Sequence, residues 1–164
     1  MWERSYVRGG SRASLHPAVS LRSMNDVTAE VTGGCMCGAV HFTVSAPLVG
    51  ALYCHCKRCQ RRTGTAFSVS GLTQPQTFAI EQGEDHVRIY EPGGDGWHKA
   101  FCRECGSQLF THHPENAELI AVRLGALDGD PGVRPAMHQF TDYAAPWMPL
   151  PDDGLPRFPE RRPR

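Results

Sequence analysis

The chain has 164 residues, of which 40% are hydrophobic, and its formal net charge at pH 7 is zero. The chain therefore lacks the strongly basic composition typical of nucleic-acid-binding proteins. It also has no run of about eighteen apolar residues, which a membrane-spanning helix would need. We therefore expect one globular domain in a cytoplasmic protein, with no nucleic acid and no membrane as partner.

Residues 1–23 differ from the rest because they are rich in Arg and Ser and lack a periodic apolar pattern. We predict that they are a disordered extension or an overextended gene start ahead of Met24. A transit peptide is the competing interpretation, since such peptides are rich in Arg and Ser and poor in acidic residues. Residues 24–158 are predicted to form the single domain and residues 159–164 a basic tail.

From Val31 onward the sequence predicts short strands separated by Gly and Pro. Helical patterning is scarce, and the only expected helical turn covers residues 57–63 and is ended by Gly64. The stretch from Pro131 is rich in proline and predicts an irregular strap rather than a second domain. We therefore expect a mainly β domain of antiparallel strands with little helix. The clearest predicted strands are residues 39–44, 66–70, 77–80, 86–90, 108–111 and 119–124.

All seven cysteines fall into three clusters, at positions 35 and 37, 54, 56 and 59, and 102 and 105. An odd number of cysteines and the C-x-C spacing disfavour disulfides. A structural zinc ion takes four protein ligands, whereas a catalytic ion takes three and keeps one position open. The first and third clusters, each beside glycines, are the natural pair for a closed site, and the middle cluster is suited to an open one.

Four cationic side chains surround the middle cluster, namely Lys57, Arg58, Arg61 and Arg62. We predict that they stabilise thiolates and attract an anionic substrate, although a solvated helical face is an equally good interpretation. Both zinc sites would be structural if a histidine closed the second one. The candidates for that fourth ligand are His55, His98, His112 and His113.

Four segments of the chain together resemble one known family, the glutathione-dependent formaldehyde-activating enzymes, which also includes the centromere protein V type of domain. The resemblance covers roughly residues 31–158. The segments that carry it are residues 33–40 (GGCMCGAV), 54–59 (CHCKRC) with Gly64 behind them, 101–109 (FCRECGSQL), and the ending formed by residues 145–147 and 153–158.

The resemblance implies a zinc-dependent β-tent fold with two zinc ions per chain. It implies a structural zinc held by Cys35, Cys37, Cys102 and Cys105, and a catalytic zinc held by Cys54, Cys56 and Cys59. The namesake reaction joins glutathione and formaldehyde to give S-(hydroxymethyl)glutathione, and its reverse is a carbon–sulfur lyase reaction. His55 or a zinc-bound water is the expected proton donor.

Two noncatalytic interpretations stand beside this one. The domain could be a zinc-binding interaction module, which requires saturated metal ligation and a docking face. It could also be a redox sensor in which Cys54, Cys56 and Cys59 release zinc on oxidation. A metal position that exchanges ligands distinguishes the enzyme from the first alternative, and reversible zinc release by peroxide identifies the second.

Overall fold

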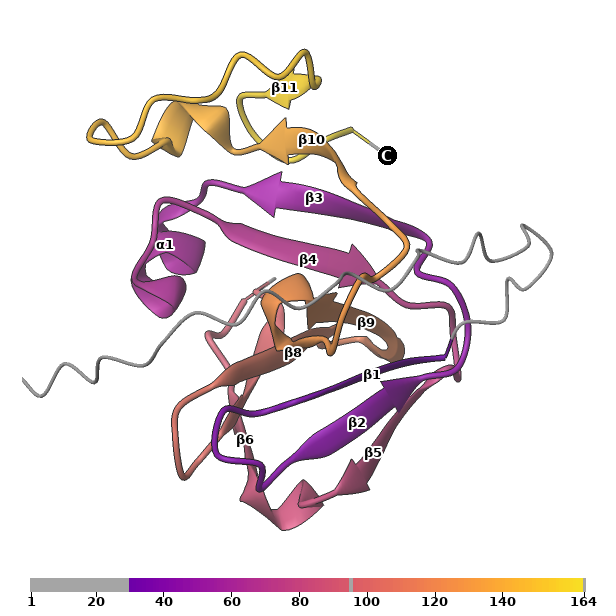
Figure 1. Ribbon diagram of the computed structural model, residues 1–164. Coiled ribbons are helices and arrows are strands. Elements are labelled where there is room, and N and C mark those ends of the chain that lie inside the picture. The colour runs from indigo at the N-terminus through magenta and orange to yellow at the C-terminus, as the bar shows by residue number, and fades with distance from the viewer. Residues whose placement is uncertain (1–29, 95, 164) are drawn as a thin grey trace, which may run out of the picture.

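The computed structural model of the chain describes residues 30–94 and 96–163, which form two β-sheets (Figure 1). The smaller sheet has the order β1-β2-β5, with β1 (Val31–Gly34), β2 (His41–Val44) and β5 (Phe78–Gln82). The larger sheet has the order β11-β10-β3-β4-β9-β8-β7-β6. Its strands are β3 (Gly50–Cys54), β4 (Ser68–Leu72), β6 (Val87–Tyr90), β7 (His98–Cys102), β8 (Gln108–His113), β9 (Asn116–Arg123), β10 (Pro135–Gln139) and β11 (Arg157–Phe158).

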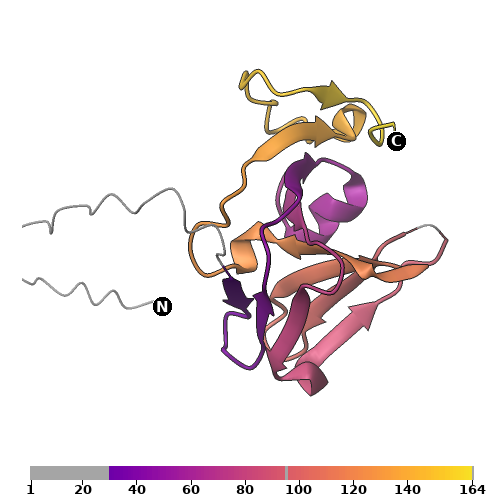
Figure 2. The same ribbon diagram turned by 90° about the vertical axis from the view of Figure 1, so that its right-hand side faces the viewer.

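The hydrophobic core lies between the two sheets. Val40, Phe42 and Val44 are almost completely buried around β2, and they form one cluster with buried residues of the larger sheet such as Leu109 and Val122. Full burial of a side chain of this size contributes about 1.5–3 kcal/mol. In Figure 2 the smaller sheet and strands β6 to β8 lie in the lower part of the view, while β10 and β11 lie at the top.

The prediction of a mainly β domain with little helix is confirmed. The single α-helix of the described residues is α1 (Lys57–Thr63), with the predicted bounds. Gly64 ends it in the left-handed conformation with φ of 67°, and its N–H donates to the carbonyl of Gln60 at 2.9 Å. Three short 3-10 turns also occur, η1 (Glu84–His86), η2 (Leu124–Ala126) and η3 (Thr141–Tyr143).

The larger sheet is mixed rather than wholly antiparallel, because β10 runs parallel to both β3 and β11. The expected irregular strap after Pro131 therefore contains two strands. Strands β1, β3, β7, β10 and β11 were not among the predicted strands, since each is short or lacks a clear alternating pattern. Strands β3 and β10 pair with each other although they are far apart in the sequence, as in the pairing of Tyr53 with His138.

The predicted extension at residues 1–23 lies outside the described residues. The tail is tied to the domain through Glu160, whose carbonyl accepts a hydrogen bond from the Phe140 N–H at 3.1 Å. Within residues 30–94 and 96–163, no helix has the length and apolar character needed to cross a membrane.

Candidate metal centres

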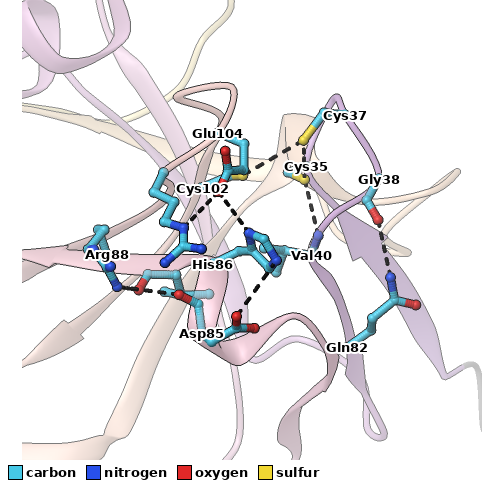
Figure 3. Close-up of polar contacts among 12 residues, drawn as sticks. Cys35, Cys37, Gly38, Val40, Gln82, Asp85, His86, Arg88, Cys102 and Glu104 are labelled. Carbon is cyan, nitrogen blue, oxygen red and sulfur yellow. Dashed lines mark hydrogen bonds and ion pairs between the residues drawn. The ribbon is translucent and has the colours of Figure 1, made fainter.

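The first and third cysteine clusters meet in space. Cys35 and Cys37 lie in the loop after β1, Cys102 ends β7, and Cys105 lies in the turn before β8. Their four sulfur atoms all lie within 4.8 Å of one another. The Sγ atoms of Cys35 and Cys37 are 3.5 Å apart, and those of Cys37 and Cys102 are 3.9 Å apart (Figure 3). A tetrahedral zinc ion with bonds of about 2.3 Å requires sulfurs about 3.8 Å apart, so this group fits zinc.

Hydrogen-bond donors surround the first group. The Val40 N–H donates to Cys35 Sγ at 3.2 Å (Figure 3). Hydrogen bonding with Ser107, whose Oγ lies 3.2 Å from Cys105 Sγ, lowers the pKa of Cys105 to about 6. Such contacts favour thiolates, which are the form that ligates metals. Cys102 is completely buried and is also part of the hydrophobic core.

A surface network supports the turn that carries Cys102 and Cys105. Glu104 accepts from Arg103 Nε at 2.7 Å and lies 2.9 Å from His86 Nδ1 (Figure 3). The Arg103 hydrogen bond, followed by that of His86, lowers the pKa of Glu104. The Arg103 N–H also donates to the carbonyl of His86 at 2.8 Å, so η1 is linked to the cysteine turn.

The middle cluster forms a second group of three sulfurs. Cys54 ends β3, Cys56 is the N-cap residue of α1, and Cys59 lies in the first turn of that helix. The Sγ atoms of Cys54 and Cys56 are 3.7 Å apart, and the Cys59 N–H donates to Cys56 Sγ at 3.4 Å. In the free thiol state, hydrogen bonds within the group lower the pKa of Cys59 and raise that of Cys54. The donor type and spacing again fit zinc.

Histidine does not close this second group in the described part of the chain, where no His, Asp or Glu atom joins the three sulfurs. The His98 ring packs edge-on against His112, with centroids 4.9 Å apart. His113 packs in the same way against Trp97. The three-sulfur set therefore leaves one position of a tetrahedral ion without a protein ligand from these residues.

Strand register places the sulfur group on a polar face of the larger sheet. Cys54 pairs with Ser68, Ser70 pairs with Arg123, and Lys99 pairs with Thr111. Paired residues and residues two apart point to the same face of a sheet. Through the pairing of Thr111 with Ala121, all these residues lie on one face, opposite the core residue Val122. The second metal centre thus lies on the side of the sheet that faces away from the core.

Two of the cations that approach the second sulfur group come from strands. Arg123 is only 7% exposed and donates from Nη1 to Ser70 Oγ at 2.7 Å. Burial lowers the pKa of Lys99 to about 8, an effect that negative charge on Cys59 opposes. Neither residue was predicted from the sequence, although the alternation of β9 could have identified the face on which Arg123 lies.

The four predicted cations of the helix divide into two sets. Arg62 points inward and donates from Nη2 to the Ala100 carbonyl at 2.7 Å, and burial lowers its pKa to about 9. The other three, Lys57, Arg58 and Arg61, are exposed. Any part they take in substrate binding remains a prediction.

His55 lies in a different environment from the sulfurs on either side of it. Its Nε2 is 2.9 Å from His138 Nδ1, and His138 Nε2 is 2.9 Å from Asp153 Oδ2. His138 pairs with Tyr53 and stacks on its ring, on the sheet face opposite Cys54. Burial, and then the neighbouring His138, lower the pKa of His55. The ring therefore lies behind the sulfur group, beside a cavity of about 140 Å³, and its role as proton donor stays a prediction.

Known proteins resemble this chain in sequence and in fold. Residues 30–143 match the family described as glutathione-dependent formaldehyde-activating enzyme. A Halomonas elongata protein named "Putative glutathione-dependent formaldehyde-activating enzyme" is 27% identical over 124 residues, which cover 72% of this chain and 79% of that protein. The crystal structure of a Rhodobacter sphaeroides protein has a TM-score of 0.52 and 23% identity, and the match covers 77% of this chain and 98% of that one; this likeness concerns the fold. The chain belongs to the glutathione-dependent formaldehyde-activating enzyme family.

Proposed function

We propose that the protein is a zinc-dependent carbon–sulfur lyase that makes and breaks the adduct of a thiol, such as glutathione, with formaldehyde. The observation that carries this proposal is the second sulfur group, in which Cys54, Cys56 and Cys59 come together and no fourth His, Cys, Asp or Glu of the described residues joins them. Three protein ligands and an open position are the pattern of catalytic rather than structural zinc. The first group, with four cysteines, then holds the structural ion.

The reaction needs a thiol in its ionised form beside an aldehyde. Zinc held by the three cysteines would favour the thiolate form of the incoming thiol. In the forward direction the substrate sulfur forms a bond to the carbonyl carbon and the π pair of the C=O bond moves to oxygen. The proton lost by the thiol ends on that oxygen, so atoms and charge balance. The cations Arg62, Lys99 and Arg123 give the region a positive character that suits a carboxylate-bearing thiol.

Lys99 is the strand cation best placed to bind the anionic part of the substrate, because no hydrogen bond or ion pair to another described residue involves its Nζ. Replacing it by Met should raise KM for glutathione about tenfold with little change in kcat, the effect of one charge-assisted hydrogen bond. Because the pKa of Lys99 is lowered to about 8, its positive charge is lost as the pH rises through 8. The difference in KM between wild type and Lys99→Met should therefore shrink between pH 7 and pH 9.5.

The charges that face Lys99 are those of Cys59, Cys56, Arg123 and Arg62. The wild type and Lys99→Met share these charges. Both also experience the same ionisation of the substrate thiol, so the comparison isolates Lys99. Lys57→Met is the matched control on the exposed helix face, for which we expect less than a twofold effect. An unchanged KM in Lys99→Met, or a larger effect in Lys57→Met, would assign anion binding to the helix instead.

The proposed function is tested by metal analysis followed by titration with glutathione under X-ray absorption spectroscopy. We expect two zinc ions per chain and one additional sulfur neighbour when glutathione is added. Turnover of glutathione and formaldehyde, followed by NMR of the adduct, should depend on that bound zinc. Two zinc ions with saturated ligation that respond to no thiol would contradict the enzyme and favour an interaction module. Reversible zinc release by peroxide without turnover would favour a redox sensor.

A further inference from the structure

The guanidinium of Arg123 is buried beside the second sulfur group and is incompletely paired. Only Nη1 has a hydrogen-bond partner among the described residues, the Ser70 hydroxyl. The Nε and Nη2 atoms are buried and have no hydrogen-bond partner in that part of the chain. Leaving a buried charged donor unsatisfied is costly, so these two donors require a partner.

The cysteine sulfurs are the negatively charged groups that act on this guanidinium. Negative charge on Cys59, Cys54 and Cys56 opposes the lowering of the Arg123 pKa by burial, so the guanidinium and the three sulfurs lie in one neighbourhood. Ser68, two residues from the Ser70 anchor, pairs with Cys54, so the anchor lies on the same sheet face as this sulfur group. Three thiolates on a divalent zinc ion carry a net charge of minus one, which one guanidinium neutralises.

The other two cations do not have this arrangement. Arg62 Nη2 donates to the carbonyls of Ala100 and Phe110, which hold it between β7 and β8. Lys99 interacts with Cys59 and Cys56 through its charge and not through a hydrogen bond. Arg62 has one buried N–H donor without a partner, at Nη1, and among the sulfurs only the charge of Cys59 acts on it. Arg123 has two such donors, and the charges of all three sulfurs act on it.

We propose that Arg123 is a positioning residue that donates N–H hydrogen bonds to the metal-bound thiolate of Cys59 and protects this sulfur from electrophiles. The proposal rests on the proposed zinc at the second sulfur group. Such bonds withdraw electron density from sulfur and make it a weaker nucleophile. A site that handles formaldehyde needs this protection, because attack by Cys59 would join its sulfur to the aldehyde carbon. Arg123 thereby directs the aldehyde to the substrate thiol.

The test measures alkylation of the zinc-loaded protein by iodoacetamide, resolved for each cysteine by peptide mass spectrometry. Replacing Arg123 by Met removes the donors and the charge while keeping most of the side-chain volume. Alkylation of Cys59 should become about tenfold faster, the lower range for loss of an outer-sphere partner, whereas Cys37 and Cys105 should react as before. Arg123→Lys, which keeps the charge but has fewer fixed donors, should give an intermediate rate.

Two further variants separate this role from a structural one. Ser70→Ala removes the Nη1 anchor but leaves the guanidinium, so it should accelerate Cys59 alkylation by a smaller factor; it also tests the proposal if Arg123→Met does not fold. Arg134→Met, which breaks an exposed ion pair with Asp130, is the matched control and should change nothing. An unchanged Cys59 rate in Arg123→Met and Ser70→Ala, or a parallel increase at all seven cysteines, overturns the proposal.

A second readout uses cobalt in place of zinc. The energy of the sulfur-to-cobalt charge-transfer band reports the electron density on the thiolates, and it should shift to lower energy in Arg123→Met and partly return in Arg123→Lys. Zinc content is measured on the same samples. Absence of a second zinc from the wild type would overturn the proposed function as well. A second zinc with unaltered Cys59 reactivity and an unshifted band in the variants overturns only the role of Arg123.

Discussion

Replacing Cys102 by Ala should abolish cooperative folding. Its sulfur lies 3.9 Å from that of Cys37, a residue 65 positions away in the sequence, and a structural zinc contributes on the order of 10 kcal/mol to folding. The total stability of a domain is only about 5–15 kcal/mol, so loss of this ligand leaves little or none. We expect the near-ultraviolet circular dichroism and the sharp thermal transition to disappear. Thermal unfolding followed by circular dichroism is the measurement.

Cys102 is also a core residue, so a control for lost packing is needed. Val122→Ala removes apolar volume from the same core and should lower the free energy of unfolding by only about 2 kcal/mol, leaving a cooperative transition. Removal of both metals from the wild type with a chelator should reproduce the Cys102→Ala state. A Cys102→Ala protein that unfolds near the wild-type temperature would mean that the first sulfur group is not a structural metal site.

Replacing Cys56 by Ser should leave the protein folded but remove its activity, in contrast to Cys102→Ala. The side chain of Cys56 caps α1 by accepting from the Cys59 N–H, and Ser is a good N-cap residue, so the helix keeps its cap. The second metal loses one of its three sulfur ligands. We expect a folded protein with one zinc fewer and a fall in turnover of more than about a hundredfold.

Metal content by mass spectrometry, thermal unfolding and turnover of glutathione with formaldehyde are measured on the same Cys56→Ser sample. Cys56→Ala serves as a comparison, because it loses both the metal ligand and the helix cap. Its free energy of unfolding should be about 1 kcal/mol lower than that of Cys56→Ser. Equal loss of both metals in Cys56→Ser would show that the two sulfur groups are not independent. Full metal content with normal turnover would remove Cys56 from the site.

Local chemistry explains which parts of this fold were predictable. The bounds of α1 depend on Gly64 and on the absence of Gly and Pro before it, both of which the sequence displays directly. Strands such as β2 and β5 were predicted because they alternate and end near Gly or Pro. Strand β10 begins with Pro135 in a proline-rich stretch, and its parallel neighbours β3 and β11 are set by long-range pairing. Local pattern contains no information on such pairing.

The candidate site also has a part that the sequence predicted and a part that it did not. Seven cysteines in three clusters predicted the partition into four and three, and the sulfur groups of the structure have this composition. The cations were harder to predict, because Lys99 and Arg123 are single charged residues in strands. Their approach to Cys59 depends on the register of β4 with β9 and of β7 with β8. The sequence instead suggested the helix cations, of which only Arg62 points inward.

The two sulfur groups differ greatly in the length of chain that they enclose. Cys54, Cys56 and Cys59 span six consecutive positions, whereas Cys37 and Cys102 are 65 positions apart. An unfolded chain can therefore bind a metal with the local triplet but not with all four cysteines of the other group. Ligands that also bind the unfolded state stabilise the fold less. Added zinc should thus raise the unfolding temperature mainly through the distant cysteines, while the triplet captures the first ion during refolding.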